Sequence, residues 1–143
     1  MFLIGEIAKK FNLSISAIRY YDKMGLLKFV KKENGIRKFD DRDVETIYMI
    51  ECLKKSGLTI KEIKEFLDWV AMGDGTLQKR LDFFETQQVK VEKEILELQK
   101  ILDLIKFKTW YYSEAVKKGT DKNLLNIESM PESIKQLYIN SHS

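Results

Sequence analysis

The sequence SISAIRYYDK, residues 14–23, decides how the rest of this chain is arranged. Wound as an α-helix, it separates into two faces, because positions three and four residues apart share a side. On one face, Ile15 and Ile18 are predicted to pack inward. The other face carries hydroxyl, guanidinium, phenol and ammonium groups, from Ser16, Arg19, Tyr20 and Lys23. Groups of these kinds suit phosphate oxygens and base edges, so this face has the chemistry of a nucleic-acid contact.

The helix also has suitable ends. Ser14 is a favoured N-cap residue, and Gly25 suits the left-handed backbone position beyond the last turn. An ordinary solvated surface helix has the same pattern, since a basic helix face is commonly just hydrated. The interpretation therefore depends on the sequence on either side.

Length and composition limit the class of protein. The chain has 143 residues, of which 44% are hydrophobic and 33% charged, as in a soluble domain with a large helical surface. It shows neither a signal peptide nor an apolar run long enough to cross a bilayer. The single cysteine, Cys52, excludes an internal disulfide and a cysteine metal cluster. We expect a cytoplasmic protein without a membrane partner, cofactor or metal.

Positive charge is concentrated near the start of the chain. Residues 1–39 contain nine basic and three acidic residues, a net charge of +6, whereas residues 71–143 contain eleven of each. A basic region confined to one end favours a nucleic-acid contact there.

The residues before the first stretch form a second amphipathic pattern. Ile4, Ile7, Ala8 and Phe11 follow the i, i+3, i+4, i+7 rule of one helix face. A short polar break at residues 12–14 separates the two helices, which predicts a helix-turn-helix with residues 15–23 as the recognition helix.

A hairpin is predicted next. Asn34-Gly35 is a strong turn signal between the short segments 28–30 and 36–39, because both turn positions tolerate positive φ. A basic hairpin after a helix-turn-helix is a wing, and its cations reach the DNA backbone. They are Lys28, Lys31, Lys32, Arg37 and Lys38. The alternative is a solvated surface loop.

Two further helices follow the hairpin. Asp40 or Asp41 caps the third, and Ser56-Gly57 ends it. Its inward stripe is Val44, Ile47, Ile50 and Leu53. A capping box at Thr59 to Glu62 opens the fourth, whose inward residues are Ile60, Ile63, Leu67 and Val70. Thr59 and Lys61 lie where backbone amides and a cation hold a phosphate.

A hinge at residues 73–75 precedes a long helix that contains no Pro or Gly before Gly119. Apolar residues alternate spacings of four and three along it, a heptad seam of about four repeats. The seam residues are Leu77, Leu81, Phe84, Gln88, Val91, Ile95, Leu98, Leu102 and Ile105. So narrow a seam predicts a partner helix, supplied by a second copy of the chain, with Gln88 setting the register. The alternative partner is the chain's own tail.

Aromatic residues cluster at the end of the long helix: Phe107, Trp110, Tyr111 and Tyr112. After a break at Gly119-Thr120 come Leu124, Leu125, Ile127 and Met130, and Pro131 is expected to start a last helix carrying Ile134, Leu137 and Tyr138. Such an aromatic cluster forms either a packing core or a ligand pocket.

Several motifs in this order resemble the DNA-binding domain of MerR-type transcriptional regulators. They are Ile4-Gly5-Glu6-Ile7-Ala8, residues 14–21, Gly25-Leu26-Leu27, Asn34-Gly35-Ile36-Arg37, residues 40–56 and 58–68, and the long helix. The resemblance covers residues 2–70 by motif and extends to about residue 107 by architecture. We therefore expect a mainly α fold: a winged helix-turn-helix with a small β-hairpin (1–72), a hinge and long coiled-coil helix (73–118), and a short helical tail (119–143).

The resemblance implies a homodimer with an antiparallel coiled coil, bound to a near-palindromic operator in double-stranded promoter DNA. Family members bend and untwist promoters whose −35 and −10 elements are too far apart, so that RNA polymerase can use them. By family position Arg19 and Tyr20 match recognition-helix contacts, Arg37 the wing contact and Lys61 a backbone contact. The family usually has Tyr where this chain has Phe39, so a phosphate contact from that hydroxyl is missing.

The candidate DNA-binding residues are Ser14, Ser16, Arg19, Tyr20, Lys23, Lys28, Lys31, Arg37, Lys38, Thr59 and Lys61. Metal-sensing members carry cysteines at both ends of the long helix, where this chain has none, so metal sensing is rejected. Cys52, beside apolar neighbours, is expected to be a buried inert thiol. We expect a small organic effector instead, bound at Phe107, Trp110, Tyr111 and Tyr112.

Three other functions fit the sequence to different degrees. A DNA-architectural or excisionase-like protein has a similar head, but most such proteins lack a long dimer seam. A regulator without a small-molecule effector fits the same sequence. An enzyme is not supported, since no acid–base pair, phosphate-binding glycine loop or nucleophile motif is present.

Overall fold

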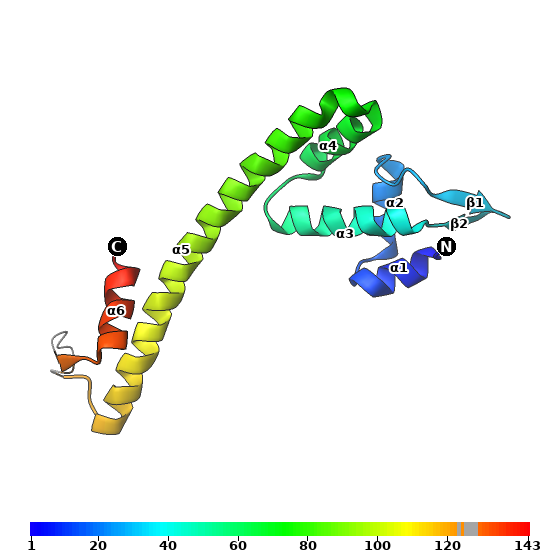
Figure 1. Cartoon of the computed structure of the whole chain (residues 1–143). Helices are drawn as coiled ribbons and strands as arrows, with labels where there is room; N and C mark the ends of the chain where they lie inside the picture. Colours follow the sequence, from blue (N-terminus) through cyan, green and yellow to red (C-terminus); the bar gives the residue numbers. More distant parts are fainter. Residues whose placement is uncertain (123, 125–128) are drawn as a thin grey trace. The chain divides into compact units, whose positions relative to one another are not determined.

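The computed structural model describes residues 1–122, 124 and 129–143, which form helices and one small antiparallel sheet (Figure 1). In chain order the elements are α1 (Ile4–Phe11), α2 (Ile15–Lys23), β1 (Lys31–Glu33), β2 (Ile36–Lys38), α3 (Asp41–Lys55), α4 (Ile60–Met72), the 3-10 turn η1 (Asp74–Thr76), α5 (Leu77–Lys118) and α6 (Glu132–Ser141). The chain divides into two compact units, Met1–Glu85 and Thr86–Ser143. The predicted mainly α fold with a hairpin and a long helix is confirmed. Leu125 and Ile127, two of the predicted tail residues, lie outside the described residues.

The predicted helix caps are formed by side chains. Ser14 Oγ accepts a hydrogen bond from the backbone N–H of Ala17 at 3.1 Å, and Thr59 Oγ1 accepts one from Glu62 N at 3.1 Å. Asp40, rather than Asp41, caps α3, and its carboxylate accepts from Arg42 N at 2.9 Å. Each cap satisfies a backbone donor that the first turn of a helix cannot pair internally.

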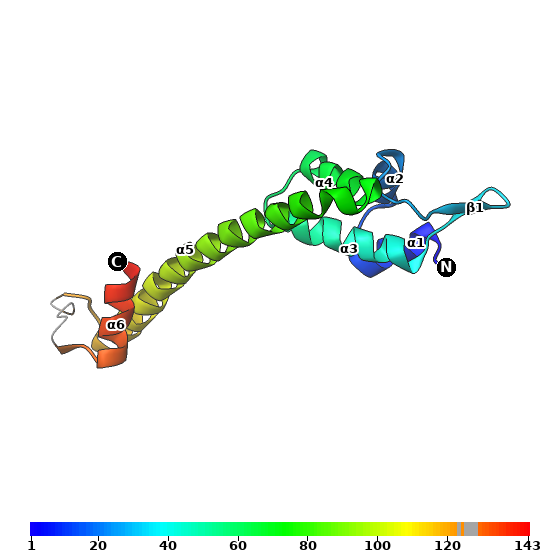
Figure 2. The ribbon, with the colours of Figure 1, turned by 45° about the horizontal axis from the view of Figure 1, so that its top comes forward.

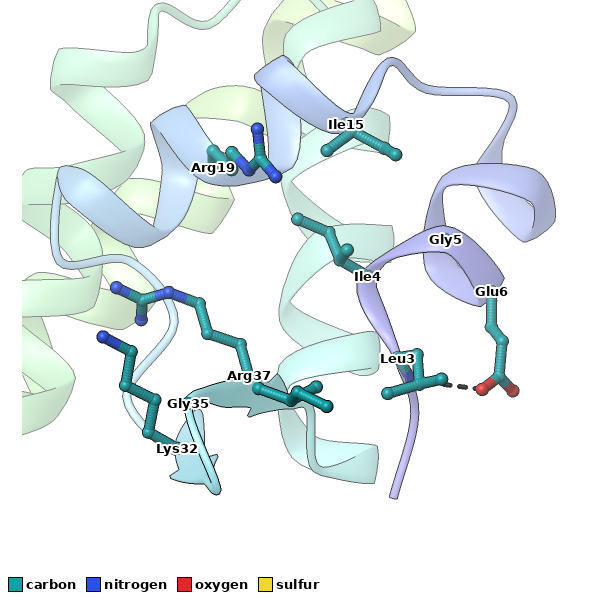
Figure 3. Close-up of a pocket in the computed structure, with 10 residues that line it drawn as sticks. Leu3, Ile4, Gly5, Glu6, Ile15, Arg19, Lys32, Gly35 and Arg37 are labelled. Atoms are coloured by element: carbon teal, nitrogen blue, oxygen red, sulfur yellow. Dashed lines mark hydrogen bonds between the residues drawn. The ribbon is translucent and has the colours of Figure 1, made fainter.

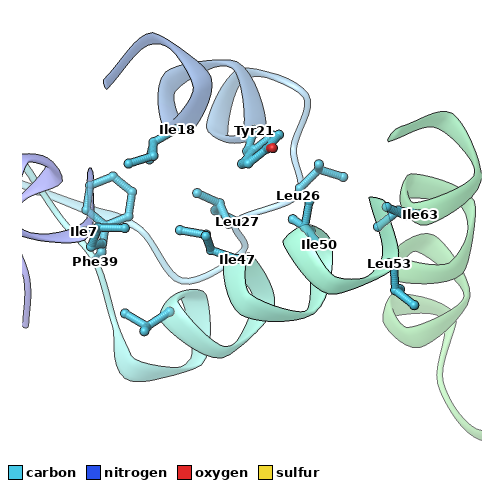
Figure 4. Close-up of a cluster of buried hydrophobic side chains, with 11 residues drawn as sticks. Ile7, Ile18, Tyr21, Leu26, Leu27, Phe39, Ile47, Ile50, Leu53 and Ile63 are labelled. Carbon is cyan, nitrogen blue, oxygen red and sulfur yellow. The ribbon is translucent and has the colours of Figure 1, made fainter. Parts of the chain in front are cut away.

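The core of the first unit lies between α1, α2, α3 and α4 (Figure 4). The buried stripe predicted on α3 is confirmed, and Ile47 and Ile50 are fully buried. The other members of the core are Ile7, Ile18, Tyr21, Leu26, Leu27, Phe39, Val44, Leu53 and Ile63. At about 25 cal/mol per Å² of apolar surface, burial of these side chains is the main stabilisation of the unit.

Three predictions about buried positions were wrong. Ile15 and Val70 were expected inward, but they are 40% and 44% exposed. On α4 the buried aromatic residue is Phe66, whose ring lies 5.0 Å from those of Phe83 and Phe84 in the first turns of α5. This packing turns Phe66 inward and leaves Val70, four residues later, at the edge of the contact.

The third error is Cys52, which is exposed rather than buried. The inward stripe of α3 passes through Ile50 and Leu53, and Cys52 lies about 160° and 100° round the helix from them, on its outer side. Its apolar neighbours in sequence therefore point away from it, because consecutive helix residues are about 100° apart.

The hairpin begins later than predicted. Its strands pair Lys31 with Lys38, Lys32 with Arg37 and Glu33 with Ile36, whereas the sequence favoured 28–30 for the first strand. Phe29 is held by α3 instead: its N–H donates to Asp43 Oδ1 at 3.0 Å, and its ring lies 3.6 Å from the Arg42 guanidinium carbon. In both views the hairpin extends beyond α1, α2 and α3 (Figures 1 and 2).

In the second unit α6 lies beside the last turns of α5 (Figures 1 and 2). Phe107 is 2% exposed, and its ring meets that of Tyr138 edge-on at 5.1 Å between centroids. As predicted, α5 ends before Gly119, which has φ +81°, and α6 begins after Pro131. Among the described residues, no helix is apolar over a long enough stretch to cross a membrane.

Candidate DNA-binding surface

The helix α2 is anchored by Ile18 and Tyr21, which leaves its polar face accessible. Ile18 is fully buried, and Tyr21 is 2% exposed. The Tyr21 hydroxyl donates to Glu51 Oε1 at 2.6 Å and accepts from Lys54 Nζ at 2.7 Å, so α2 is bonded to α3. Burial, followed by the hydrogen bond to Glu51, raises the pKa of Tyr21. These contacts fix the rotation of α2 about its own axis.

The predicted contact face of α2 is accordingly on the surface. Ser14, Ser16, Arg19, Tyr20 and Lys23 are all exposed, and the hydroxyls of Ser14 and Ser16 lie 3.3 Å apart. The exposed fraction of Tyr20 is 47%. Tyr20 and Tyr21, adjacent in the sequence, thus have opposite roles, one on the surface and one in the core.

The wing is held at its base by one pair of backbone–backbone hydrogen bonds and by a carboxylate that accepts from two backbone N–H groups. Phe39 and Phe2 exchange N–H···O bonds of 2.8 Å, which pin the end of β2 to the start of the chain. The buried carboxylate of Asp43 accepts from Phe29 N at 3.0 Å and Asp40 N at 3.2 Å. Burial raises the pKa of Asp43, although both backbone donors act against that rise.

The hairpin tip is a tight turn at Asn34 and Gly35, with φ values of +51° and +78°. The predicted turn is confirmed, and it leaves the basic side chains on either strand pointing off the two faces of a ribbon.

An ion pair joins the wing to α2. Arg37 Nη1 lies 2.6 Å from Asp22 Oδ2, whose side chain is only 14% exposed. Together with Arg19 and Lys23, these two residues line a depression of about 330 Å³. Three cations and one carboxylate, from α2 and the wing, thus line the same depression. The sequence placed Arg37 on the wing but did not predict its contact with Asp22, because nothing in the local pattern brings residues 22 and 37 together.

On the wing, like charges stand directly opposite one another. The register places Lys31 across from Lys38 and Lys32 across from Arg37. Side chains directly opposite in an antiparallel pair share one face, so each face of the hairpin carries two adjacent cations. Directly opposed cations destabilise a hairpin, and their repulsion is reduced when phosphate anions lie over them.

The start of α4 differs in part from the prediction. The Thr59 hydroxyl is engaged in the capping box: it accepts from Glu62 N and donates to Glu62 Oε1 at 2.9 Å. Lys61 is exposed in the first turn of α4, near the backbone amides of the helix N-terminus. Lys28, before the wing, is also exposed.

A second hollow, of about 730 Å³, lies between α1, α2 and the wing (Figure 3). Its walls include the apolar side chains of Leu3, Ile4, Ile15 and Ile36. Arg19, Lys32 and Arg37 supply its basic rim, and the Glu6 carboxylate accepts from Leu3 N at 3.2 Å. The sequence pattern did not predict this hollow, because it predicted that Ile15 lies in the core.

The chain is similar to several known proteins. Residues 2–69 match the MerR HTH family of regulatory proteins. An uncharacterized HTH-type transcriptional regulator of Haemophilus influenzae is 38% identical over 128 residues, which cover 89% of this chain and 94% of the relative. The crystal structure of HiNmlR, a MerR family regulator lacking the sensor domain, bound to promoter DNA, is 34% identical, with a TM-score of 0.80 over 91% of this chain and 96% of that chain. A MerR family regulator from Bacillus thuringiensis is 39% identical, with a TM-score of 0.66 over 76% of this chain and 96% of its own.

A winged helix-turn-helix with a cationic outer face defines a DNA-binding protein. Together with these similarities, it shows that the chain belongs to the MerR family of transcriptional regulators. The protein is a DNA-binding regulator and not an enzyme.

Proposed function

We propose that this regulator binds promoter DNA as a twofold homodimer, with α2 in the major groove and the wing on the adjacent backbone. The proposal rests mainly on one observation: Arg19 and Lys23 of α2 and Arg37 of the wing line the same depression. Phosphates are the anions that match this cluster and the opposed cations of the hairpin. The α2 face then reads base edges while the wing sets the register on the backbone.

The remaining predicted contacts fit the same docking. Ser14, Ser16 and Tyr20 share the exposed side of α2 with Arg19, and Lys28, Lys31 and Lys38 belong to the wing and its approach. Lys61 contacts the backbone from the start of α4. Thr59 contributes through the amides that it orients, because its hydroxyl is already bonded within the cap.

Footprinting on the promoter of the protein's own gene tests this docking. We expect two protected half-sites about one helical turn apart, roughly 34–36 Å, related by an approximate palindrome. Protection that spreads evenly over every duplex, with no sequence preference, would contradict it.

The dimer rests on the seam along α5. Of its nine predicted residues, Leu77, Leu81, Ile95, Leu98 and Ile105 are each more than half exposed in the single chain. A stripe of large apolar side chains at heptad spacing needs a matching helix to cover it, and a second copy offers the same stripe. An antiparallel pairing gives the twofold symmetry that a near-palindromic operator requires.

The dimer would act on transcription by deforming DNA. Two linked heads hold a duplex bent and untwisted, which brings promoter elements that are too far apart into a geometry that RNA polymerase uses. The test is in vitro transcription from the bound promoter and from one with a spacer of ordinary length. We expect a regulatory effect that depends on spacer length. DNA bending without any effect on transcription would indicate an architectural role instead.

We also propose that a small organic effector binds at the aromatic end of α5. Phe107 is buried against Tyr138, so its ring packs the tail, whereas Trp110, Tyr111 and Tyr112 keep accessible surface with polar tips. In an antiparallel dimer this end lies beside the partner's head, where a ligand would alter the angle between the heads.

Alanine variants test the effector site. Replacing Trp110 or Tyr112 by Ala should remove the transcriptional response and leave operator affinity and melting temperature unchanged. Variants that lower the melting temperature with no selective loss of response would place these side chains in the packing and the effector elsewhere.

A further inference from the structure

An isoleucine stands on the DNA-facing side of α2, where the sequence pattern had placed it inside. Ile15 is the first residue of α2 and is 40% exposed, whereas Ile18, which lies about 60° round the helix from it, is fully buried. Ile15 precedes Arg19 by four residues, so the two share one helix face, and both line the hollow between α1, α2 and the wing (Figure 3).

Helix stability does not account for this residue. First-turn positions favour Pro or acidic side chains, and a β-branched residue loses rotamer freedom in a helix. Leaving a large apolar side chain in water also forgoes the stabilisation that its burial would bring. An exposed isoleucine at the leading end of a recognition helix therefore suits an apolar contact made on binding.

The surroundings of Ile15 indicate what that contact is. The hollow has apolar walls, including Ile4 and Ile36, and a rim formed by Arg19, Lys32 and Arg37. The basic rim complements a polyanion, and the apolar walls complement small apolar groups that the polyanion carries between its phosphates. In a DNA major groove the apolar group is the C5-methyl of thymine, which neither cytosine nor any minor-groove edge presents.

We propose that Ile15 reads a thymine by packing on its C5-methyl group, at one base pair in each half-site. This rests on the proposed docking of α2, in which the N-terminal residues of the helix approach base edges. Ile15 then sets specificity through shape and apolar contact, while Arg19, one turn further on, reads polar groups of a neighbouring pair.

The test is selection from two random duplex libraries, one synthesised with thymine and one with uracil, which differs only by lacking the methyl group. For the wild type we expect the thymine library to yield a consensus with an A·T pair at two symmetric positions. In the uracil library that preference should disappear while the rest of the consensus persists. On the selected duplex, replacing the two thymines by uracil should weaken binding about fourfold per half-site, from roughly 0.8 kcal/mol per buried methyl at 1.4 kcal/mol per tenfold.

Ile15→Ala should bind the thymine and uracil duplexes equally, and Ile15→Val, which keeps a branched side chain, should retain part of the difference. Val70→Ala is the matched control, because Val70 is also a branched apolar residue, is 44% exposed and is not among the residues that line the hollow. It should keep the full thymine dependence. If Ile15→Ala does not fold, Ile15→Val replaces it in the comparison, and its thymine dependence should fall below that of the wild type.

Equal loss on the uracil duplex for the wild type and Ile15→Ala would overturn the assignment of the methyl contact to Ile15 and leave the docking intact. No thymine dependence in the wild type would do the same. If the wild type enriches no sequence from either library, the proposed function fails as well as this inference.

Discussion

Individual residues in this head are distinguished by their partners more than by their type. Tyr20 and Tyr21 are neighbours with the same side chain, yet the first is exposed and the second is bonded to Glu51 and Lys54 of α3. The Tyr21 hydroxyl, with both a donor and an acceptor partner, helps to fix α2 on α3.

Tyr21→Phe removes that hydroxyl and leaves the ring. We expect the free energy of unfolding to fall by about 0.5–1.5 kcal/mol, because the net value of a hydrogen bond lies in that range and Glu51 loses a donor. Urea denaturation measures this. Tyr20→Phe is the matched control and should change the free energy of unfolding by less than about 0.5 kcal/mol. Equal effects of the two changes would mean that the network with α3 does not stabilise the fold.

A second residue-scale prediction concerns pH. The Arg42 guanidinium and backbone N–H lower the pKa of Asp40 from 3.8 to about 2. Because the folded-state pKa lies below the ordinary value, ionisation of Asp40 stabilises the fold above about pH 4, and this contribution is lost as the pH falls toward 2. An NMR titration of the carboxyl carbon should find the low midpoint. Arg42→Ala should move it back toward 3.8, and an unchanged midpoint in that variant would refute the assigned cause.

At the scale of elements, the recognition helix and the wing are joined but carry different contacts. The Arg37–Asp22 ion pair and the bonds of Asp43 to Phe29 and Asp40 hold the wing beside α2. In the proposed docking, the α2 face offers a planar guanidinium to base edges, whereas the opposed lysines of the wing offer point charges to phosphates.

Arg19→Ala and Lys31→Ala should therefore differ in kind. If Arg19 reads a base, its loss costs about 1–3 kcal/mol on the selected site and blurs the preference at that position. Lys31→Ala should weaken binding to all sequences alike and flatten the dependence of affinity on salt by about one phosphate contact. Binding measured over a salt series, on selected and random duplexes, compares the two. Equal losses on both duplexes for both variants would remove the distinction.

The packing of α6 on α5 gives another element-scale prediction. Phe107 is buried against Tyr138, whereas Tyr112, five residues later, is 55% exposed. Phe107→Ala should destabilise this unit by about 3–5 kcal/mol, the range for a buried aromatic ring. Hydrogen exchange of the α6 amides should speed up accordingly. Tyr112→Ala should leave that exchange unchanged, and a similar acceleration in both variants would show that Phe107 is not the main anchor of α6.

At the scale of the whole molecule, the single chain leaves the heptad stripe of α5 uncovered. Leu98 is 63% exposed at a seam position, and Val89 is 68% exposed outside the seam. The proposed dimer distinguishes these two residues, because only the first is covered by the partner helix.

Leu98→Asp should abolish dimerisation, since it places two charges in an apolar seam. Val89→Asp carries the same change on the opposite side and should remain dimeric. Analytical ultracentrifugation at micromolar concentration measures both. A monomeric wild type, or an equal effect of the two substitutions, would contradict the predicted seam. Loss of the dimer should also lower operator affinity, because the second half-site is no longer bound by a linked head.

The local elements of this protein could be predicted from its sequence. Helix caps at Ser14 and Thr59, the turn at Asn34-Gly35 and the unbroken α5 all follow from short-range rules, because caps, turns and periodicity act over a few residues. Family motifs in the right order identified the DNA-binding class for the same reason, since the motifs record local structure.

Which element covers each helix face depends on the packing of the folded chain and could not be predicted from the sequence. In the folded chain Ile15 and Cys52 are exposed, the Tyr21 hydroxyl is hydrogen-bonded to α3, and Arg37 forms an ion pair with Asp22. Periodicity defines the faces of a helix but not the element that covers each of them, because that depends on contacts between residues far apart in the chain. The apolar hollow beside the recognition helix likewise depends on contacts between distant residues, because it is formed where α1, α2 and the wing meet.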